Sequence, residues 1–315
     1  MTYGSIGKDP VAQAAPETAP AALDDSSGGE VRAAGSPWRR AVAVFLQNRL
    51  AVVGLGLIIA LVLFCFVGPL FYHTDQVHTN LINSNLPPGS GHPLGTDPTG
   101  YDELGRLMYG GQASLEVGIA AAVLATIVGT LYGAISGYLG GAIDSIMMRL
   151  VDGLLAIPSL FILLVLSVIF HPSTGIMILI IAFFSWLGAS RLVRGEALSL
   201  RVREYVQAVK VMGGGGARAV VRHVAPNAIG TVVVFATFTV ADSIILLSVL
   251  GYLGLGIQPP QTDWGAMLST ATTYLNSGYW WLIYPPGLAI VLVAIAFTFL
   301  GDALRDAFDS RMQAR

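Results

Sequence analysis

Six apolar runs constrain the fold of this chain more than any other feature of its 315 residues. A helix needs about 20 predominantly apolar residues to cross the hydrocarbon core of a bilayer. The composition agrees, because 54% of the residues are hydrophobic and only 11% are charged, against about 25% charged in soluble domains. We therefore predict an all-α integral membrane protein with six transmembrane helices. The predicted spans cover residues 50–71, 115–138, 146–170, 176–190 and 229–250, and a last span ends near residue 300.

The basic residues predict how these spans are oriented. If both termini are cytoplasmic, all 17 Lys and Arg residues except Arg106 fall in cytoplasmic segments or at cytoplasmic helix ends. The positive-inside rule demands such a bias, and the inverted topology would violate it. Arg39, Arg40 and Arg49 flank the first run, which has no convincing cleavage site, so we expect an uncleaved first helix.

Composition divides the chain into four stretches. Residues 1–37 are rich in Ala, Pro, Gly, Ser and Asp, and we expect a disordered cytoplasmic tail. Residues 38–112 hold the first span and an external loop, residues 113–302 hold the other spans, and residues 303–315 form a short cytoplasmic tail. The single cysteine, Cys65, excludes disulfides within the chain and cysteine metal clusters.

A polar, basic stretch at residues 199–226 separates two spans and must lie in water. Apolar residues recur at helical spacing between 202 and 212, and basic residues charge the other faces. The glycines at 213–216 interrupt this helix, since each costs about 1 kcal/mol relative to alanine. A second short helix is predicted at 217–224, and Pro226 suits the first position of the next span. We predict a loop of fixed shape that presents a small knob to the cytoplasm.

Four residues of this stretch resemble the EAA loop of permease subunits of bacterial ABC importers: Glu204, Ala208, Gly213, and Pro226 thirteen residues after that glycine. Two departures are Ala225, where the family usually has leucine, and the looser run of glycines. Three further motifs, within a match from about Trp38 to the C-terminus, resemble the C-type permease of dipeptide and oligopeptide importers. They are Leu94-Gly-Thr-Asp97 with Gly100 and Asp102; Asp144, Arg149, Asp152 and Pro158; and Leu253-Gly-Leu-Gly256 with Gln258-Pro-Pro260 and Trp264-Gly265.

The resemblance implies a type I ABC importer transmembrane fold in a bacterial cytoplasmic membrane. In that family the short helix of the loop is a coupling helix seated in a cleft of an ATPase subunit. A basic loop that merely obeys the positive-inside rule would explain the charge of the stretch, but not its spacing. The implied coupling residues are Glu204, Ala208, Gly213, Gly214, Arg218, Arg222, His223 and Pro226.

The same resemblance implies the partners of the chain. A homologous B-type permease subunit would enclose the pathway with it, two ABC ATPase domains would bind ATP and Mg, and an extracytoplasmic substrate-binding protein would deliver cargo. The chain lacks a phosphate-binding Gly-x-x-x-x-Gly-Lys-Ser/Thr sequence, a His-Glu-x-x-His sequence and a Gly-x-Ser-x-Gly sequence. We therefore expect no enzyme, no cofactor in this chain and no nucleic-acid partner.

One ionisable residue, Asp242, lies in the middle of the fifth predicted span. An acid there costs at least about 2.5–3.5 kcal/mol on insertion scales, so it should face water or a polar partner. It either lines the pathway, together with Thr239 and Ser243, or makes a structural hydrogen bond to a neighbouring helix. The family usually has a glutamate near the position of Leu247, so the acid would have moved by roughly one turn.

A charged group lies near the cytoplasmic end of the third span. Arg149 is three residues from Asp152 and five from Asp144, and we expect a local ion pair that ties spans together, with a substrate contact as the alternative. Pro158 must kink this span or break its hydrogen bonds. In the second span Gly129, Gly133 and Gly137 make a bare face that lets another helix approach closely.

The external loops carry acids and histidines. Asp97 and Asp102 suit turn and capping roles better than a calcium site, because no dense run of oxygen ligands surrounds them. The spacing of His73, His78 and His92 is too irregular to favour a metal site. We also expect short helices at 101–109, lying in the interface, and within 257–281. An aromatic belt should mark the entry of the last span at Tyr279, Trp280, Trp281 and Tyr284.

We interpret the chain as the permease subunit of an ATP-driven peptide importer. Nickel chelates, glutathione and haem remain alternative cargoes, because relatives of this family carry them. A second hypothesis is a secondary transporter or channel that works without an ATPase. Such proteins often contain internal repeats around a mid-membrane ion site, and no clear repeat is visible here. A scaffold that does not transport would leave the coupling spacing unexplained.

Overall fold

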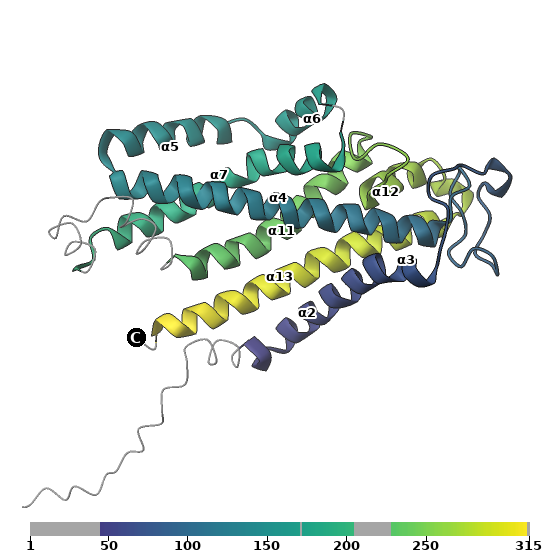
Figure 1. The fold of residues 1–315 in the computed structure, drawn as a ribbon, viewed down its shortest axis with the longest axis horizontal. Helices are drawn as coiled ribbons and strands as arrows, with labels where there is room; N and C mark the ends of the chain where they lie inside the picture. Colours follow the sequence, from purple (N-terminus) through teal and green to yellow (C-terminus); the bar gives the residue numbers. More distant parts are fainter. Residues whose placement is uncertain (1–44, 171, 205–227, 314–315) are drawn as a thin grey trace, which may run out of the picture. The chain divides into compact units, whose positions relative to one another are not determined.

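The computed structural model describes residues 45–170, 172–204 and 228–313, with side chains up to residue 308. The chain divides into two units, Met1–Ser36 and Pro37–Arg315, and the described residues belong to the second. The predicted disordered tail lies outside them. Throughout the described part the regular elements are helical, and the bridge between Thr96 and Asp102 is the one strand-like pairing there. Figure 1 shows the long helices running side by side.

The described residues contain five helices, or helix series, long and apolar enough to cross a membrane, and six spans if one bent pair is counted. This confirms the predicted all-helical membrane fold. The shorter elements are η2 (Leu81–Asn83), α12 (Trp264–Thr272), η4 (Leu275–Ser277) and η5 (Trp280–Leu282). The spans are α2 (Arg49–Val62) with η1 (Leu63–Val67) and α3 (Gly68–Phe71), α4 (Glu103–Leu139), α5 (Gly141–Leu155) with α6 (Ser159–Ile169), α7 (Thr174–Leu200), α11 (Ile229–Tyr252) and α13 (Tyr284–Gln313).

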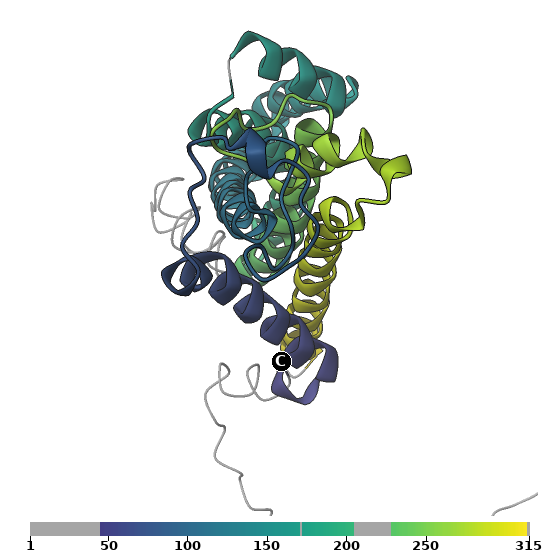
Figure 2. The same cartoon turned by 90° about the vertical axis from the view of Figure 1, so that its right-hand side faces the viewer.

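The third predicted span is broken into two helices. α5 and α6 meet at an angle of 79° around Pro158. Proline has no N–H to donate and disfavours the helical conformation of the residue before it, so the hydrogen-bonded ladder ends there. The prediction of a kink or break at Pro158 is confirmed. In Figures 1 and 2, α5 and α6 lie on the opposite side of the helices from α2.

α4 is much longer than predicted. The expected interfacial helix at 101–109 is wrong as a separate element, because these residues continue into α4, which Asp102 caps through Gly105 N at 2.8 Å. The exposed aliphatic side chains of α4 begin at Ile119 and end at Leu139, about 30 Å apart along the axis, which is the thickness of the hydrocarbon core. The first part of α4 therefore extends beyond this band. By the predicted orientation we call that end of the molecule the external end.

α4 and α7 form the most extensive helix pair, and small residues make their close contact possible. A Cβ atom at Gly129, Gly133 or Gly137 would clash with α7 backbone near Trp186, Ser190 and Arg194. The predicted bare face is confirmed, and it packs on α7. Lipid chains are as apolar as side chains, so such close packing holds helices together in a membrane where hydrophobic burial cannot.

α11 packs between α4 and α13, and α2 packs on α13. Figure 2 looks onto the external end, where the loops before α4 and the α12 region cover the helices. The predicted aromatic belt is only partly present: Trp280 and Tyr284 are exposed, but Trp281 is 6% exposed. Its indole donates to the carbonyl of Thr96 at 3.3 Å, so it holds the two external segments together.

Backbone contacts seat α12 on the end of α11. Asp263 is fully buried and accepts hydrogen bonds from Ala266 N at 3.0 Å and Ile257 N at 3.1 Å. Burial raises the pKa of the Asp263 carboxyl to about 6. A Cβ at Gly251 or Gly256 would clash with this carboxylate. This explains the Leu253-Gly-Leu-Gly256 motif in part, and confirms the short helix expected within 257–281.

Candidate functional site

The coupling stretch falls mostly outside the described residues. Glu204, the last described residue before the gap at 205–227, is exposed. The structure does not describe Ala208, Gly213, Gly214, Arg218, Arg222, His223 or Pro226, so their coupling role stays a prediction. The helices on either side of the gap are α7 and α11, and their contacts decide where a force applied at this stretch would go.

The end of α7 is tied to α4 and α5 through one buried carboxylate. Asp144 accepts hydrogen bonds from Arg194 Nε at 2.6 Å and Arg194 Nη2 at 2.7 Å, and from Ser136 Oγ at 2.5 Å. Arg201 donates to the carbonyl of Gly137 at 3.3 Å. Three helices therefore meet at Asp144, which is 7% exposed.

The expected ion pairs that tie spans together are present at Asp144 and Asp152, but Arg149 is wrong as their partner. Arg149 is exposed and forms none of the ion pairs seen in the described part of the chain. Five residues rotate a helix by about 140°, so Arg149 points away when Asp144 faces α7. Asp152 pairs instead with Arg191, and both of these side chains are more than half exposed. The acids of α5 therefore form ion pairs with arginines of α7, and not with Arg149 of their own helix.

A further contact joins the two helices that flank the coupling stretch. Thr231 Oγ1 at the start of α11 donates to Glu196 Oε1 of α7 at 3.2 Å. Phe235 of α11 lies against Gly188 of α7, where an added Cβ would come within 3.1 Å of the ring. α7 and α11 are thus packed together near the gap.

The predicted pathway residues do not share one face. Asp242 is exposed on α11, whereas Thr239 and Ser243 are 4% and 0% exposed. Thr239 Oγ1 donates to the carbonyl of Phe235 at 2.8 Å, a hydrogen bond within the helix. The predicted polar stripe is therefore wrong, and Asp242 remains the pathway candidate. Leu247 is fully buried on another face, so Asp242 does not replace an acid at that position.

At the external end, Asp102 joins the loop to α4. Its Oδ2 accepts from Tyr72 OH and contacts His92 Nδ1, both at 2.8 Å. Burial and the neighbouring Asp102 carboxylate raise the pKa of Tyr72 to about 12. Asp97 Oδ1 accepts from the backbone N–H of Thr99 and Tyr101, at 2.8 and 2.9 Å. These contacts confirm the predicted capping and turn roles.

The other external histidine with a carboxylate partner is His78, whose ring lies 2.9 Å from Asp75. Hydrogen bonds from Val77 N and His78 N lower the pKa of Asp75 to about 2. Within the described ranges no group of three His, Cys, Asp or Glu side chains is arranged to hold a metal ion.

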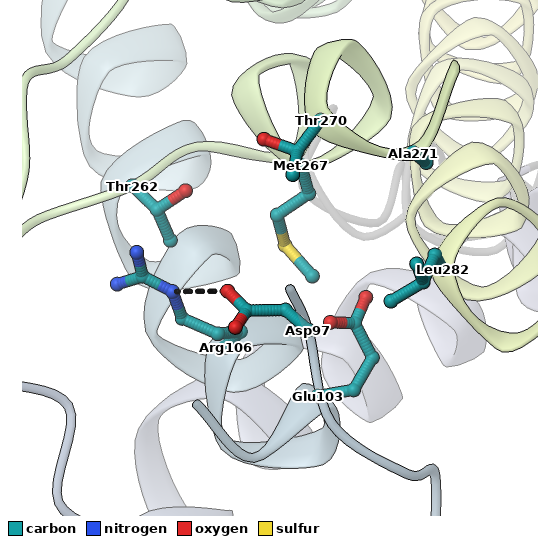
Figure 3. Close-up of a pocket in the computed structure, with 8 residues that line it drawn as sticks. All are labelled: Asp97, Glu103, Arg106, Thr262, Met267, Thr270, Ala271 and Leu282. Carbon is teal, nitrogen blue, oxygen red and sulfur yellow. Dashed lines mark ion pairs between the residues drawn. The ribbon is translucent and has the colours of Figure 1, made fainter. Parts of the chain in front are cut away.

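Arg106 occupies the centre of the external end. Its Nε lies 3.9 Å from Asp97 Oδ2, its Nη1 donates to the carbonyl of Pro260 at 2.7 Å, and its guanidinium lies 4.1 Å from the centre of the Tyr101 ring. Figure 3 shows Asp97, Glu103 and Arg106 lining a small pocket beneath Met267. The guanidinium therefore connects the first external loop, α4 and the segment before α12.

A second, more open pocket lies beside the same arginine. Gln76, Arg106, Tyr109, Gln112, Glu116 and Gln261 are among its lining residues. Gln112 donates to the carbonyl of Cys65 at 2.7 Å, in the π-helical turn of the first span. The lining is mixed: Val77, Ala113 and Pro260 contribute apolar surface, and Arg106 and Glu116 are its charged residues.

Sequence reasoning missed two arginines that organise the molecule. Arg106 was visible only as the one external exception to the positive-inside bias, and that isolation was the available signal. Arg194 had no such signal, since it is one of many basic residues in its predicted cytoplasmic region. Its partner, Asp144, is fifty residues away in the sequence.

Comparison with known proteins finds two family models. The model described as binding-protein-dependent transport system inner membrane component matches residues 129–314. The model described as N-terminal TM domain of oligopeptide transport permease C matches residues 36–88.

Three relatives illustrate the similarity of whole chains. The dipeptide transport system permease protein DppC of Bacillus subtilis (strain 168) is 38% identical over 276 residues, which are 88% of this chain and 85% of the relative. The oligopeptide transport system permease protein OppC of Escherichia coli (strain K12) is 41% identical over 278 residues, 88% of this chain and 92% of the relative. A putative peptide permease protein of Brucella suis biovar 1 is 40% identical over 288 residues, 91% of this chain and 95% of the relative.

Proposed function

The chain belongs to the family of binding-protein-dependent transport system inner membrane components, and we propose that it is the permease subunit of an ATP-driven importer of dipeptides or oligopeptides. The observation that carries this proposal is its similarity to peptide permeases over 88% of its length. It is a multi-pass membrane subunit without a catalytic role, and it works with a binding protein.

The finer assembly is part of the proposal. A homologous B-type permease completes the pathway, and two ATPase domains that bind ATP and Mg dock on the cytoplasmic side. Support comes from Asp242, an acid on an exposed face of α11 within a predicted span. Because lipid would make this acid costly, its face should meet water or the second permease.

The contacts around the coupling stretch support a mechanism in which a force applied there moves several helices together. We call this the lever. A push at residues 205–227 would reach α7 and α11, which flank it. α7 carries α4 through their close glycine contact and α5 through the Arg194–Asp144 pair. These helices would tilt together, because packed interfaces shift between discrete arrangements instead of deforming smoothly.

Uptake by the reconstituted transporter tests the function. The chain is co-expressed with its binding protein, second permease and ATPases, and the purified complex is placed in proteoliposomes. ATP supplied on the side of the membrane where the ATPases lie should drive uptake of labelled dipeptide or tetrapeptide from the other side. A chain that purifies without ATPase subunits and still transports would favour the secondary transporter instead.

A further inference from the structure

The first membrane span contains a π-helical turn near its external end. α2 ends at Val62, the π-helical η1 covers Leu63–Val67, and α3 completes the span. The backbone N–H of Gly68 donates to the carbonyl of Leu63, which lies five residues earlier instead of four. The turn therefore accommodates one extra residue. Such turns are rare, and they occur frequently at functional sites.

Pro69 explains why the turn forms at this place. Proline has no N–H to donate, and its ring clashes with the carbonyl four residues earlier, which here is the carbonyl of Cys65. That carbonyl instead accepts a hydrogen bond from Gln112 Nε2 of α4 at 2.7 Å. The first span therefore lacks one hydrogen bond within itself and has one to another helix in its place.

The residues from the turn onward are fixed to α4. The side chain of Cys65 is fully buried, and a Cβ added to Gly111 of α4 would clash with its sulfur. Tyr72, which follows α3 directly, donates through its hydroxyl to Asp102, the residue that caps α4. The external part of the first span and the first turns of α4 are thus held together from both sides of α3.

The residues before the turn are fixed to a different helix. α2 packs on α13 and has little contact with α4. A Cβ added to Gly54 would lie 2.8 Å from the carbonyl oxygen of Ala296, so the backbones of α2 and α13 approach each other closely. In Figure 1, α2 and α13 run together, and α11 separates them from α4 and α7. The two parts of one span therefore belong to two groups of helices.

We propose that the π-helical turn around Cys65 is a hinge in the first span. The hinge rests on the proposed function, in which a push on the coupling stretch tilts α4, α5 and α7 together. α2 and α13 keep their contact while their cytoplasmic ends move relative to α4, and the segment after the turn stays on α4. Bending at the turn breaks no hydrogen bond between Cys65 and Pro69, because Pro69 cannot make one.

The geometry sets the size of the expected movement. Val53 lies twelve residues before Cys65, which is about 18 Å along the axis of a helix. Rotations of about 15° are typical of rigid bodies that switch between two arrangements. A swing of that size about the turn would move Val53 by about 5 Å relative to α4.

Distances between paired nitroxide labels in the complete transporter test the hinge. The labels are placed at exposed positions: Val53 of α2, Phe71 of α3, Ile135 of α4 and Ile295 of α13. Cys65, the single native cysteine, is fully buried and can stay in place. The purified complex in nanodiscs is measured by double electron–electron resonance, first without nucleotide and then after trapping with ATP and vanadate.

The distance from Val53 to Ile135 should change by about 5 Å between the two states. The distances from Phe71 to Ile135 and from Val53 to Ile295 should stay the same, because each pair lies within one group of helices. A first span that moves as one rigid rod overturns the inference, since the distance from Phe71 to Ile135 would then change as well. An unchanged distance from Val53 to Ile135 also overturns it, and so does a changed distance from Val53 to Ile295.

A pair of glutamine variants tests the fixed end of the hinge. Gln112→Leu removes the hydrogen bond that holds the turn on α4, so it should broaden the distribution of distances from Phe71 to Ile135. Gln47→Leu, at an exposed glutamine before α2, is the matched control and should leave this distribution as in the wild type. An unchanged distribution in Gln112→Leu would contradict the attachment of the turn to α4.

Uptake of labelled peptide by the wild-type transporter separates this inference from the proposed function. If no peptide enters the proteoliposomes, the proposed function fails. If peptide enters and the distances do not follow the expected pattern, the hinge alone is refuted.

Discussion

Asp144 and Asp263 are both buried carboxylates, but they are stabilised by different partners. Asp144 has a bidentate arginine and a hydroxyl, whereas Asp263 has backbone N–H groups and no ion pair in the described part of the chain. A charge-assisted pair in a partly buried site fixes two side chains in one geometry. Backbone amides fix a loop instead. The two acids therefore hold helices together in one case and a helix cap in the other.

Removing Arg194 should destabilise the protein far more than removing Arg191. Arg194→Ala leaves the carboxylate of Asp144 buried without its cation, which costs on the order of 3 kcal/mol. Arg191→Ala breaks an exposed pair with Asp152, which is worth about 0–1 kcal/mol. Thermal unfolding of the purified complex in detergent would show the difference. Equal losses in the two variants would mean that the Asp144 contact does not hold the helices.

Asp263 should give the external end a pH dependence of its own. Its folded pKa of about 6 lies above the ordinary 3.8, so its contribution to stability is full below about pH 4 and is lost as pH rises through 6. The difference is on the order of 3 kcal/mol. Asp263→Asn cannot ionise, so it should gain stability relative to the wild type between pH 4 and 7.

Thermal unfolding of both proteins across this range measures the effect. Asp75→Asn is the control, because the pKa of Asp75 is lowered to about 2 and its contribution is lost only below pH 4. A stability difference between wild type and Asp263→Asn that stays constant from pH 4 to 7 would contradict the assignment.

At the scale of the element, the contact between α4 and α7 depends on the absence of side chains. Gly133→Ala should separate the two helices, because the added Cβ would overlap the backbone of Ser190. Gly195→Ala in α7 meets nothing within 4 Å and should be neutral or stabilising by up to about 1 kcal/mol. Melting temperature and peptide uptake, measured together, check this. Wild-type behaviour of Gly133→Ala would show that the contact is looser than described.

The apolar runs and the proline predicted most of the elements. Membrane helices must satisfy their backbone internally, so a long apolar run is nearly sufficient to define a span. Pro158 predicted the break between α5 and α6 for a local reason, because proline has no backbone N–H to donate. The length of α4 was not predictable in the same way, because residues 103–114 are polar enough to resemble a loop and are helical through the Asp102 cap and packing against α12.

The candidate site was predicted only where a residue acts through its own neighbours in sequence. Asp97 and Asp102 cap turns a few residues away, so their roles could be read from the motif. Arg149 and Arg194 could not be told apart, because the choice depends on which face of α5 meets α7. The shared pathway stripe failed for a related reason: Thr239 and Ser243 turn into the subunit, and Asp242 does not.

For the whole molecule, we propose that the subunit is moved from its cytoplasmic end and receives cargo at its external end. The two ends are joined by α4, whose 37 residues extend for about 55 Å. α4 carries Arg106 and Glu116 at the external end and the contact with α7 toward the cytoplasmic end. One continuous helix therefore joins the pockets at the external end to the proposed lever.

ATP hydrolysis and peptide uptake by the same proteoliposomes should be compared for wild type, Gly213→Asp and Gly91→Asp. Gly213 belongs to the predicted coupling loop, and Gly91 lies in an external loop with nothing within 4 Å of its added Cβ. Gly213→Asp should still hydrolyse ATP but lose most uptake, while Gly91→Asp should retain both. Unchanged uptake by Gly213→Asp would refute the coupling role of this loop.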